Sequence, residues 1–161
     1  MRVFHGSIER VKAPEIREPN RTLDYGSGFY TTTSYKQAEE WVRKRMDDSR
    51  VRKGYVNEYE LDINSLTSYK CLLFDSPTSE WIDFVMKNRL NKDFAHDYDV
   101  VYGPVANDRV YACFALYESG VMSKESLLTE LRTYDLVDQY LFHTKRSLQL
   151  LTFIKAKEIL P

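Results

Sequence analysis

Residues 25–34 read Tyr25-Gly26-Ser27-Gly28-Phe29-Tyr30-Thr31-Thr32-Thr33-Ser34. The aromatic and β-branched residues between Gly28 and Thr33 predict a short β-strand that follows two glycines. Ser34 is a favourable N-cap and predicts a helix that runs to about Asp48. This strand–turn–helix unit is the starting point for assigning the rest of the fold.

Two aromatic side chains of this unit are eleven residues apart, Tyr30 on the strand and Trp41 on the helix. The helical period groups four side chains on one face: Ala38, Trp41, Val42 and Arg45. A helix that directly follows a strand can fold this face back over the strand, so the two rings could clamp a flat ligand. The alternative is that both rings are ordinary core anchors, because large aromatic side chains also fill cores.

Outward from this unit, hydrophobic periodicity predicts strands at residues 2–5, 55–62, 68–74, 98–102, 137–143 and 152–159. Helices are predicted at residues 34–48, 78–90, 108–119 and 123–133, a helical turn at 144–151, and a short helix or loop at 8–17. We expect the strand at 68–74 to pair with the strand at 55–62. Strands interrupted by helices of uneven length favour an α+β fold over a doubly wound one.

The chain has 161 residues, which is the size of one ordinary domain, so we treat 1–161 as a single unit. Hydrophobic residues make up 43% and aromatic residues 14%, which is typical of a globular protein. The net charge of −1 argues against a protein that coats nucleic acid non-specifically. No stretch has the length of a membrane span and no signal segment opens the chain, so we expect a cytoplasmic protein without membrane contact.

The cysteine and histidine residues do not predict a metal site. Cys71 and Cys113 are far apart in apolar surroundings and are expected to be reduced core residues. His5, His96 and His143 lack metal-ligand spacing with one another and with the cysteines.

A second segment of interest is His5-Gly6-Ser7, at the end of the first predicted strand. Gly6 can present its backbone N–H and C=O without a side chain in the way, and His5 and Ser7 add an imidazole and a hydroxyl. The alternative is a strand end that enters a turn, with His5 and Ser7 acting only as caps.

These segments, together with Asp138-Gln139-Tyr140-Leu141-Phe142 near the end, resemble the diphtheria-toxin and poly-ADP-ribose polymerase branch of the ADP-ribosyltransferases. His5-Gly6-Ser7 resembles that branch's His-Gly-Ser or His-Gly-Thr opening. The segment from Tyr25 to Tyr30 is similar to its Phe-Gly-x-Gly-[Ile/Phe]-Tyr turn, and Trp41 stands where a second aromatic residue is usual. The segment 138–142 resembles its Asn-Glu-Tyr-Ile-Val strand. The resemblance brackets residues 5–159 but finds no match between about 65 and 134.

The resemblance implies a split β-sheet with surrounding helices and NAD as a substrate in the cleft. His5 would bind the adenosine-side ribose, Gly6 the carboxamide and Ser7 the nicotinamide ribose. Tyr30 and Trp41 would sandwich the nicotinamide. Gln139, in the place of the catalytic glutamate, would complete a catalytic set with Tyr30 and His5.

Two positions depart from the pattern of the branch. Gln139 is neutral, so it can hydrogen-bond a ribose hydroxyl but cannot offer a full negative charge to the transition state or act as a base. We therefore expect slow attack by water, little chain elongation, and at most a single transfer to an acceptor that brings its own nucleophile. Val137 stands where arginine-modifying relatives carry Glu or Gln, which disfavours arginine as the acceptor.

Two basic features add candidates for phosphate binding. Arg109 follows Asp108 at the start of a predicted helix and could contact a phosphate of NAD, although Asp108 could equally be a plain cap. The second is a basic stretch that could hold the pyrophosphate or a nucleic acid, or could be a solvated helix end: Arg43, Lys44, Arg45, Arg50, Arg52 and Lys53.

The sequence therefore supports three hypotheses. The first is an NAD-dependent mono-ADP-ribosyltransferase that acts on a protein or nucleic-acid acceptor, for example as the toxin of a toxin–antitoxin pair with an antitoxin partner. The second is a catalytically silent NAD-binding or protein-binding module of the same fold. The third is a nucleic-acid-binding protein that uses the basic stretch.

Overall fold

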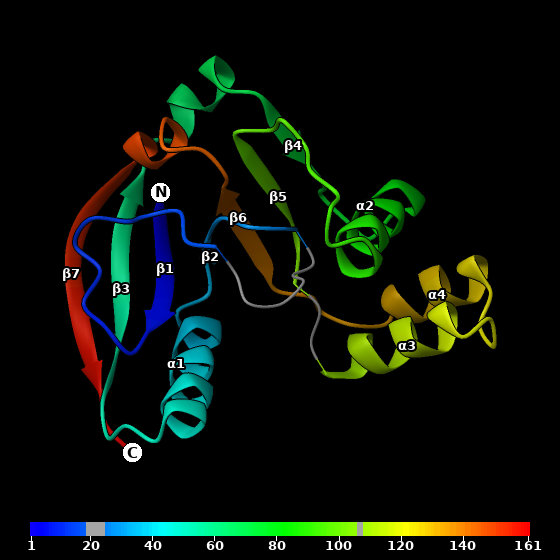
Figure 1. The fold of residues 1–161 in the computed structure, drawn as a ribbon, viewed down its shortest axis with the longest axis horizontal. Helices are drawn as coiled ribbons and strands as arrows, with labels where there is room; N and C mark the ends of the chain where they lie inside the picture. The colour runs from blue at the N-terminus through cyan, green and yellow to red at the C-terminus, as the bar shows by residue number, and fades with distance from the viewer. Residues whose placement is uncertain (19–24, 106–107) are drawn as a thin grey trace.

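The computed structural model describes residues 1–18, 25–105 and 108–161, and of residues 108 and 109 it describes the backbone alone. It is an α+β structure with two β-sheets and helices on both (Figure 1). The first sheet has the strand order β1-β3-β7 and is antiparallel throughout. Its strands are β1 (Arg2–Ser7), β3 (Gly54–Leu61) and β7 (Leu151–Ile159).

The second sheet has the order β2-β6-β5-β4. Its strands are β2 (Phe29–Thr31), β6 (Asp138–Phe142), β5 (Val100–Pro104) and β4 (Cys71–Leu73). The strand β4 pairs with β5 in parallel, and the other two pairings are antiparallel. The α+β class predicted from the sequence is therefore confirmed.

The predicted pairing of residues 68–74 with 55–62 is wrong. A 3-10 helix over Ile63–Ser68, capped by the Asp62 side chain, follows β3 directly. The next strand, β4, then joins the second sheet. A parallel pair needs a long crossover, which the helix α2 (Ser79–Leu90) supplies between β4 and β5.

Among the residues that the structure describes, the two sheets meet at one antiparallel bridge, between Phe4 in β1 and Thr32 just after β2. The backbone N–H of Phe4 donates to the Thr32 carbonyl at 2.8 Å, and the N–H of Thr32 donates to the Phe4 carbonyl at 3.0 Å. Beyond this bridge the described residues of β1 and β2 form no further pair, so the sheets diverge there.

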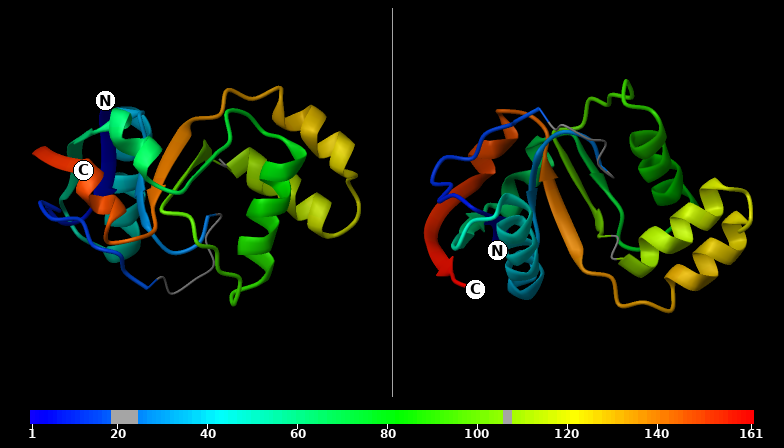
Figure 2. Two further views of the ribbon diagram at one scale, coloured as in Figure 1. Left: turned by 90° about the horizontal axis from the view of Figure 1, so that it is seen from above. Right: turned by 60° about the horizontal axis from the view of Figure 1, so that its bottom comes forward.

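Different helices pack on the two sheets. The helix α1 (Tyr35–Ser49), capped by Ser34 as predicted, lies on the first sheet and buries Ala38, Val42 and Met46. The helices α2, α3 (Asp108–Glu118) and α4 (Lys124–Leu131) lie together beside the second sheet (Figure 2). Side chains of α2, α3, α4 and the second sheet form one core cluster, which includes Trp81, Phe114 and Leu127.

A further core cluster joins the two sheets through Val3, Tyr59, Phe29 and Phe142. The connection from β6 to β7 contains a 3-10 helix over Ser147–Leu150, where a helical turn was predicted. Within the described ranges, no helix has the length and apolar character to cross a membrane.

A buried carboxylate fixes β5 to the connection between β6 and β7. Asp99 is only 8% exposed and accepts hydrogen bonds from the Lys70 backbone N–H at 3.0 Å, Thr144 Oγ1 at 2.7 Å and Arg146 Nη2 at 2.8 Å. Burial acts to raise the pKa of Asp99, but these hydrogen bonds and the Arg146 charge outweigh it and lower the pKa to about 2.

Candidate functional site

The backbone of Gly6 presents a donor and an acceptor where the two sheets diverge. Successive residues of a strand point their N–H and C=O groups to opposite edges. Because Phe4 bonds Thr32 on the edge away from β3, Gly6 points its own N–H and C=O to that same edge. Within the described residues, neither group has a hydrogen-bonding partner there.

The absence of a side chain at Gly6 is required by helix α1. A Cβ atom at this position would lie 2.4 Å from the Ala38 carbonyl oxygen and 3.0 Å from Val42 Cγ2. The close approach of α1 therefore places a helix directly over the open backbone groups of Gly6.

The imidazole of His5 is held by the neighbouring strand. Its Nδ1 lies 2.7 Å from the Tyr30 carbonyl oxygen, so Nδ1 carries the proton and donates it. The ring also lies against Phe29, with centroids 4.3 Å apart. Burial, with a smaller contribution from the positive charges of Arg17 and Arg45, lowers the pKa of His5 to about 4 against the opposing effect of the Tyr30 hydrogen bond. At neutral pH the ring is neutral, and its Nε2 can accept a hydrogen bond.

The side chain of Tyr30 stabilises the turn that precedes β2. Its hydroxyl donates to the Gly26 carbonyl at 2.6 Å, and Gly26 has a φ of +82°, which favours glycine. The ring is partly buried and packs against the core cluster of the second sheet.

Gln139 lies next to the bridge between the sheets. Thr31 pairs with Tyr140, so the same register continued by one residue sets Thr32 beside Gln139. Tyr30 pairs with Leu141, two residues from Gln139, so the side chains of Tyr30 and Gln139 lie on one face of the sheet. Gln139 is 7% exposed, and its amide makes no hydrogen bond to the described residues.

Asp138 holds the start of α1 against β6, a role that was not predicted from the sequence. Its carboxylate accepts from the Thr33 backbone N–H at 2.9 Å and from Thr33 Oγ1 at 2.7 and 2.8 Å. It also accepts from Thr32 Oγ1 and from the Tyr102 hydroxyl, each at 3.4 Å. The acid next to Gln139 and the run of three threonines before the helix were the available signals.

Trp41 is not a core anchor. The buried face of α1 consists of Ala38, Val42 and Met46, whereas Trp41 is 36% exposed and Arg45 is exposed. Of the four residues that the helical period groups on one face, Ala38 and Val42 are therefore buried, and Trp41 and Arg45 are exposed. The reason is that α1 packs on β1 and β3, which places Trp41 on the flank of the helix, where the Lys44 ammonium lies 5.5 Å from the ring centroid.

The structure gives less detail on two other predicted site residues, Ser7 and Arg109. Ser7 ends β1, and its Oγ accepts from the Glu9 backbone N–H at 3.1 Å. Arg109 lies in the first turn of α3, and its side chain lies outside the described residues. In the part of the chain that the structure describes, no three or more His, Cys, Asp or Glu side chains are grouped as a metal site.

The structure thus brings His5, Gly6, Tyr30 and Gln139 to the divergence of the two sheets and sets Trp41 on the helix that covers Gly6. This arrangement offers a backbone donor and acceptor, a neutral imidazole and an amide at one place. Such a set suits a neutral polar ligand with hydroxyl and amide groups better than a metal ion.

The chain belongs to the DUF3990 family, described as proteins of unknown function, whose family model matches residues 1–153. No curated protein matches the chain, and no solved structure matches it.

Proposed function

We propose that this protein has the ADP-ribosyltransferase fold and transfers one ADP-ribose unit from NAD to a protein or nucleic-acid acceptor. The observation that carries the proposal is the pair of open backbone groups on Gly6 at the divergence of the sheets, beside the strands that hold Tyr30 and Gln139. A carboxamide carries N–H donors beside a C=O acceptor, so the open C=O and N–H of one residue can bind it in two hydrogen bonds.

The neighbouring side chains fit the rest of NAD. His5 Nε2 can accept a hydrogen bond from a ribose hydroxyl, because Nδ1 is already committed to Tyr30. The partly exposed Trp41 ring can stack on the cationic nicotinamide, a contact of about 1 kcal/mol or more when water is excluded. Ser7 offers a hydroxyl at the end of the same strand.

The transfer breaks the bond between the ribose C1′ and the nicotinamide nitrogen, and nicotinamide leaves with the bonding electrons. An oxygen or nitrogen of the acceptor then bonds C1′ and loses its proton. Gln139 can orient the ribose by accepting from or donating to its 2′-hydroxyl. Because an amide bears no charge, it stabilises the developing positive charge less than a carboxylate would, and the acceptor must supply a reactive nucleophile.

The test is incubation with NAD labelled on the adenylate phosphate, together with a cell lysate. We expect label on macromolecules with the parent chain, and none with Gln139→Ala, which should still bind NAD. The matched control is Gln149→Ala, because Gln149 is an exposed glutamine in the 3-10 helix before β7. Equal labelling by the Gln139 and Gln149 variants would remove the catalytic role of Gln139.

Trp41→Ala should raise the Kd for NAD about fivefold to tenfold through loss of stacking. Its matched control is Tyr111→Ala, since Tyr111 is also an exposed aromatic residue on a helix, at 42% exposure. Gln139→Glu should increase the rate of labelling, because it introduces the missing negative charge at the same position.

The second candidate is a catalytically silent NAD-binding or protein-binding module of this fold. The observation that favours it is the neutral Gln139, whose amide is positioned by no hydrogen bond within the described residues. Binding of NAD by calorimetry, with no label transferred by the parent chain or by Gln139→Glu, would support this candidate. An antitoxin that blocks labelling would instead identify the chain as the toxin of a toxin–antitoxin pair.

A further inference from the structure

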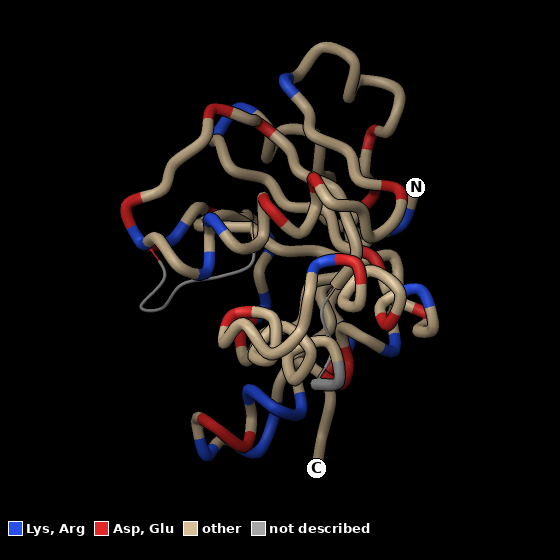
Figure 3. Tube along the Cα trace, turned by 90° about the vertical axis from the view of Figure 1, so that its right-hand side faces the viewer, with Lys and Arg blue, Asp and Glu red and all other residues tan. Residues whose placement is uncertain are grey.

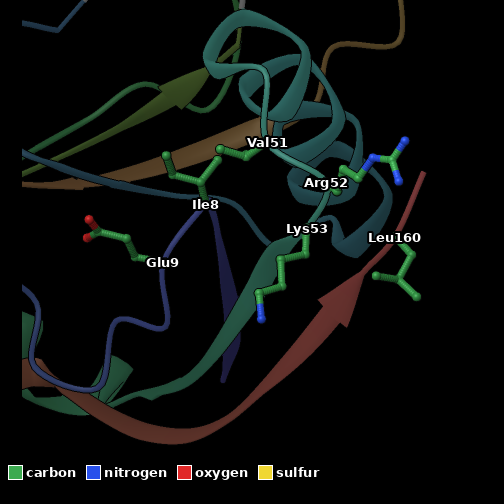
Figure 4. A pocket seen from close by; sticks show the side chains of 6 residues that line it. All are labelled: Ile8, Glu9, Val51, Arg52, Lys53 and Leu160. Carbon is green, nitrogen blue, oxygen red and sulfur yellow. The ribbon is translucent and has the colours of Figure 1, made fainter.

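A hollow of about 520 Å³ lies where the turn after α1 faces the residues that follow β1. It is lined by Ile8, Glu9, Val51, Arg52, Lys53 and Leu160 (Figure 4). Three separate segments build it, because Ile8 and Glu9 follow β1, residues 51–53 join α1 to β3, and Leu160 follows β7.

The floor of the hollow is aliphatic. The Ile8 and Val51 side chains lie next to each other, and Leu160 lies on the far side of Lys53 (Figure 4). Val51 is 38% exposed and Leu160 is 58% exposed, so apolar surface remains in contact with water. Burial of such surface by another molecule removes apolar area from water, which favours association.

The rim of the hollow is basic. Arg52 and Lys53 are exposed, and within the described residues neither makes an ion pair or a hydrogen bond. The acid of the lining, Glu9, points away from them and lies 3.4 Å from Arg17 (Figure 4). Lys and Arg also gather on α1 and the following turn, at the end of the molecule where the chain terminates (Figure 3).

The turn that carries the rim has a fixed backbone. Arg50 adopts a φ of +53° and ends α1, with its N–H donating to the Asp47 carbonyl at 3.2 Å. The Val51 N–H donates to the Met46 carbonyl at 3.0 Å. Gly54, which opens β3, is packed so closely on α1 that a Cβ there would lie 2.4 Å from Val42 Cγ1. A ligand therefore meets a preformed surface and has little backbone to order.

We propose that this hollow docks an acidic peptide segment of a partner protein. An aliphatic side chain of the segment sits on Ile8, Val51 and Leu160, and flanking carboxylates pair with Arg52 and Lys53. Charge complementarity selects an acidic occupant, because no acid among the described residues pairs with the rim cations. The aliphatic lining favours a peptide over single-stranded nucleic acid, since none of the described residues that line the hollow has an aromatic ring on which bases could stack. The proposal is independent of the transfer reaction.

The experiment measures fluorescence polarisation of a labelled short peptide of Asp, Glu and Ser with two adjacent Leu residues at its centre. Comparison peptides replace both Leu with Ser, or all acids with Lys. We expect the parent chain to bind the first peptide, to bind each comparison peptide about tenfold more weakly or worse, and to lose affinity as NaCl is raised. Equal binding of the peptide with and without Leu would overturn the proposal.

Variants of the protein locate the contact. The double variant Arg52→Glu/Lys53→Glu should weaken binding of the acidic peptide by about tenfold or more, and Val51→Ser should weaken it with the same net charge. The matched control Lys92→Glu/Lys145→Glu reverses two other exposed lysines and should bind as the parent does. If the two double variants bind alike, the peptide lies elsewhere. If a labelled oligouridylate binds more tightly than the peptide and is lost in the same rim variant, the surface is a nucleic-acid site.

Discussion

Replacing Gly6 with alanine tests how closely α1 is packed on β1. The added Cβ atom would lie 2.4 Å from the Ala38 carbonyl oxygen, which is about 1 Å inside ordinary contact distance. The obstructing atom belongs to helix backbone and cannot rotate away as the end of a side chain can. The clash is therefore relieved only if α1 moves away from the first sheet. That movement also breaks the contacts of Ala38 and Val42 with the core.

The expected loss of stability follows from these contacts. Overpacking of a core lowers the free energy of unfolding by about 1–3 kcal/mol, and we expect a clash with helix backbone to cost an amount near the upper end of this range. Alanine reduces the freedom of the unfolded chain, which offsets up to about 1 kcal/mol. The net loss in the free energy of unfolding is then about 2 kcal/mol, or roughly 4–8 °C in Tm for a chain of this size. Urea and thermal unfolding followed by circular dichroism measure both quantities.

The control is Gly120→Ala, in the turn after α3. No heavy atom lies within 4 Å of the position that a Cβ would occupy there, but φ is +79°. Backbone strain alone should cost about 1 kcal/mol or less once the unfolded-state gain is subtracted. If Gly6→Ala loses no more stability than Gly120→Ala, α1 is not packed against Gly6 as described.

Three further predictions concern buried polar groups. Tyr25→Phe should lower the free energy of unfolding by about 2–4 kcal/mol, measured in urea, because it leaves the Trp81 indole N–H and the Pro104 carbonyl unsatisfied in the core. His143→Phe should flatten the pH dependence of stability between pH 6.5 and about 4. Burial lowers the pKa of His143 to about 4, so in this range the unfolded state binds a proton that the folded state does not, and the stability of the parent falls as pH falls. An unchanged slope of the unfolding midpoint against pH would contradict this. Asp99→Asn should remove a stabilising contribution that is present above the ordinary pKa of 3.8 and is lost as pH falls toward about 2, so parent and variant should differ in Tm at pH 6 and converge near pH 2.

Several features of the fold were predictable because short-range interactions determine them. The helix after Ser34 begins where the sequence indicated, since the Ser34 side chain accepts from the Gln37 N–H within the same turn. The helix α2 follows Thr78 for the same reason. Alternation along residues 55–61 predicted β3, because each second side chain of a strand faces the same layer.

Strand pairing and the orientation of α1 could not be predicted from short-range patterns in the sequence. Residues 68–74 have strand character, but their partner was decided by the 3-10 helix over Ile63–Ser68 and the crossover through α2. The helical period correctly grouped Ala38 with Val42, yet it could not say that α1 lies on β1 and β3 and leaves Trp41 partly exposed.

For the candidate site, the sequence by itself determined which chemical groups are available: the imidazole of His5, the bare backbone of Gly6, the Tyr30 and Trp41 rings and the neutral amide of Gln139. The tertiary structure alone decided that the Gly6 N–H and C=O find no partner among the described residues on one edge, and that Asp138 fixes the start of α1 beside Gln139. The physical reason is that composition and spacing set local conformation and chemistry. Which backbone groups stay open depends on where two sheets stop pairing, and that is determined by contacts between residues far apart in the chain.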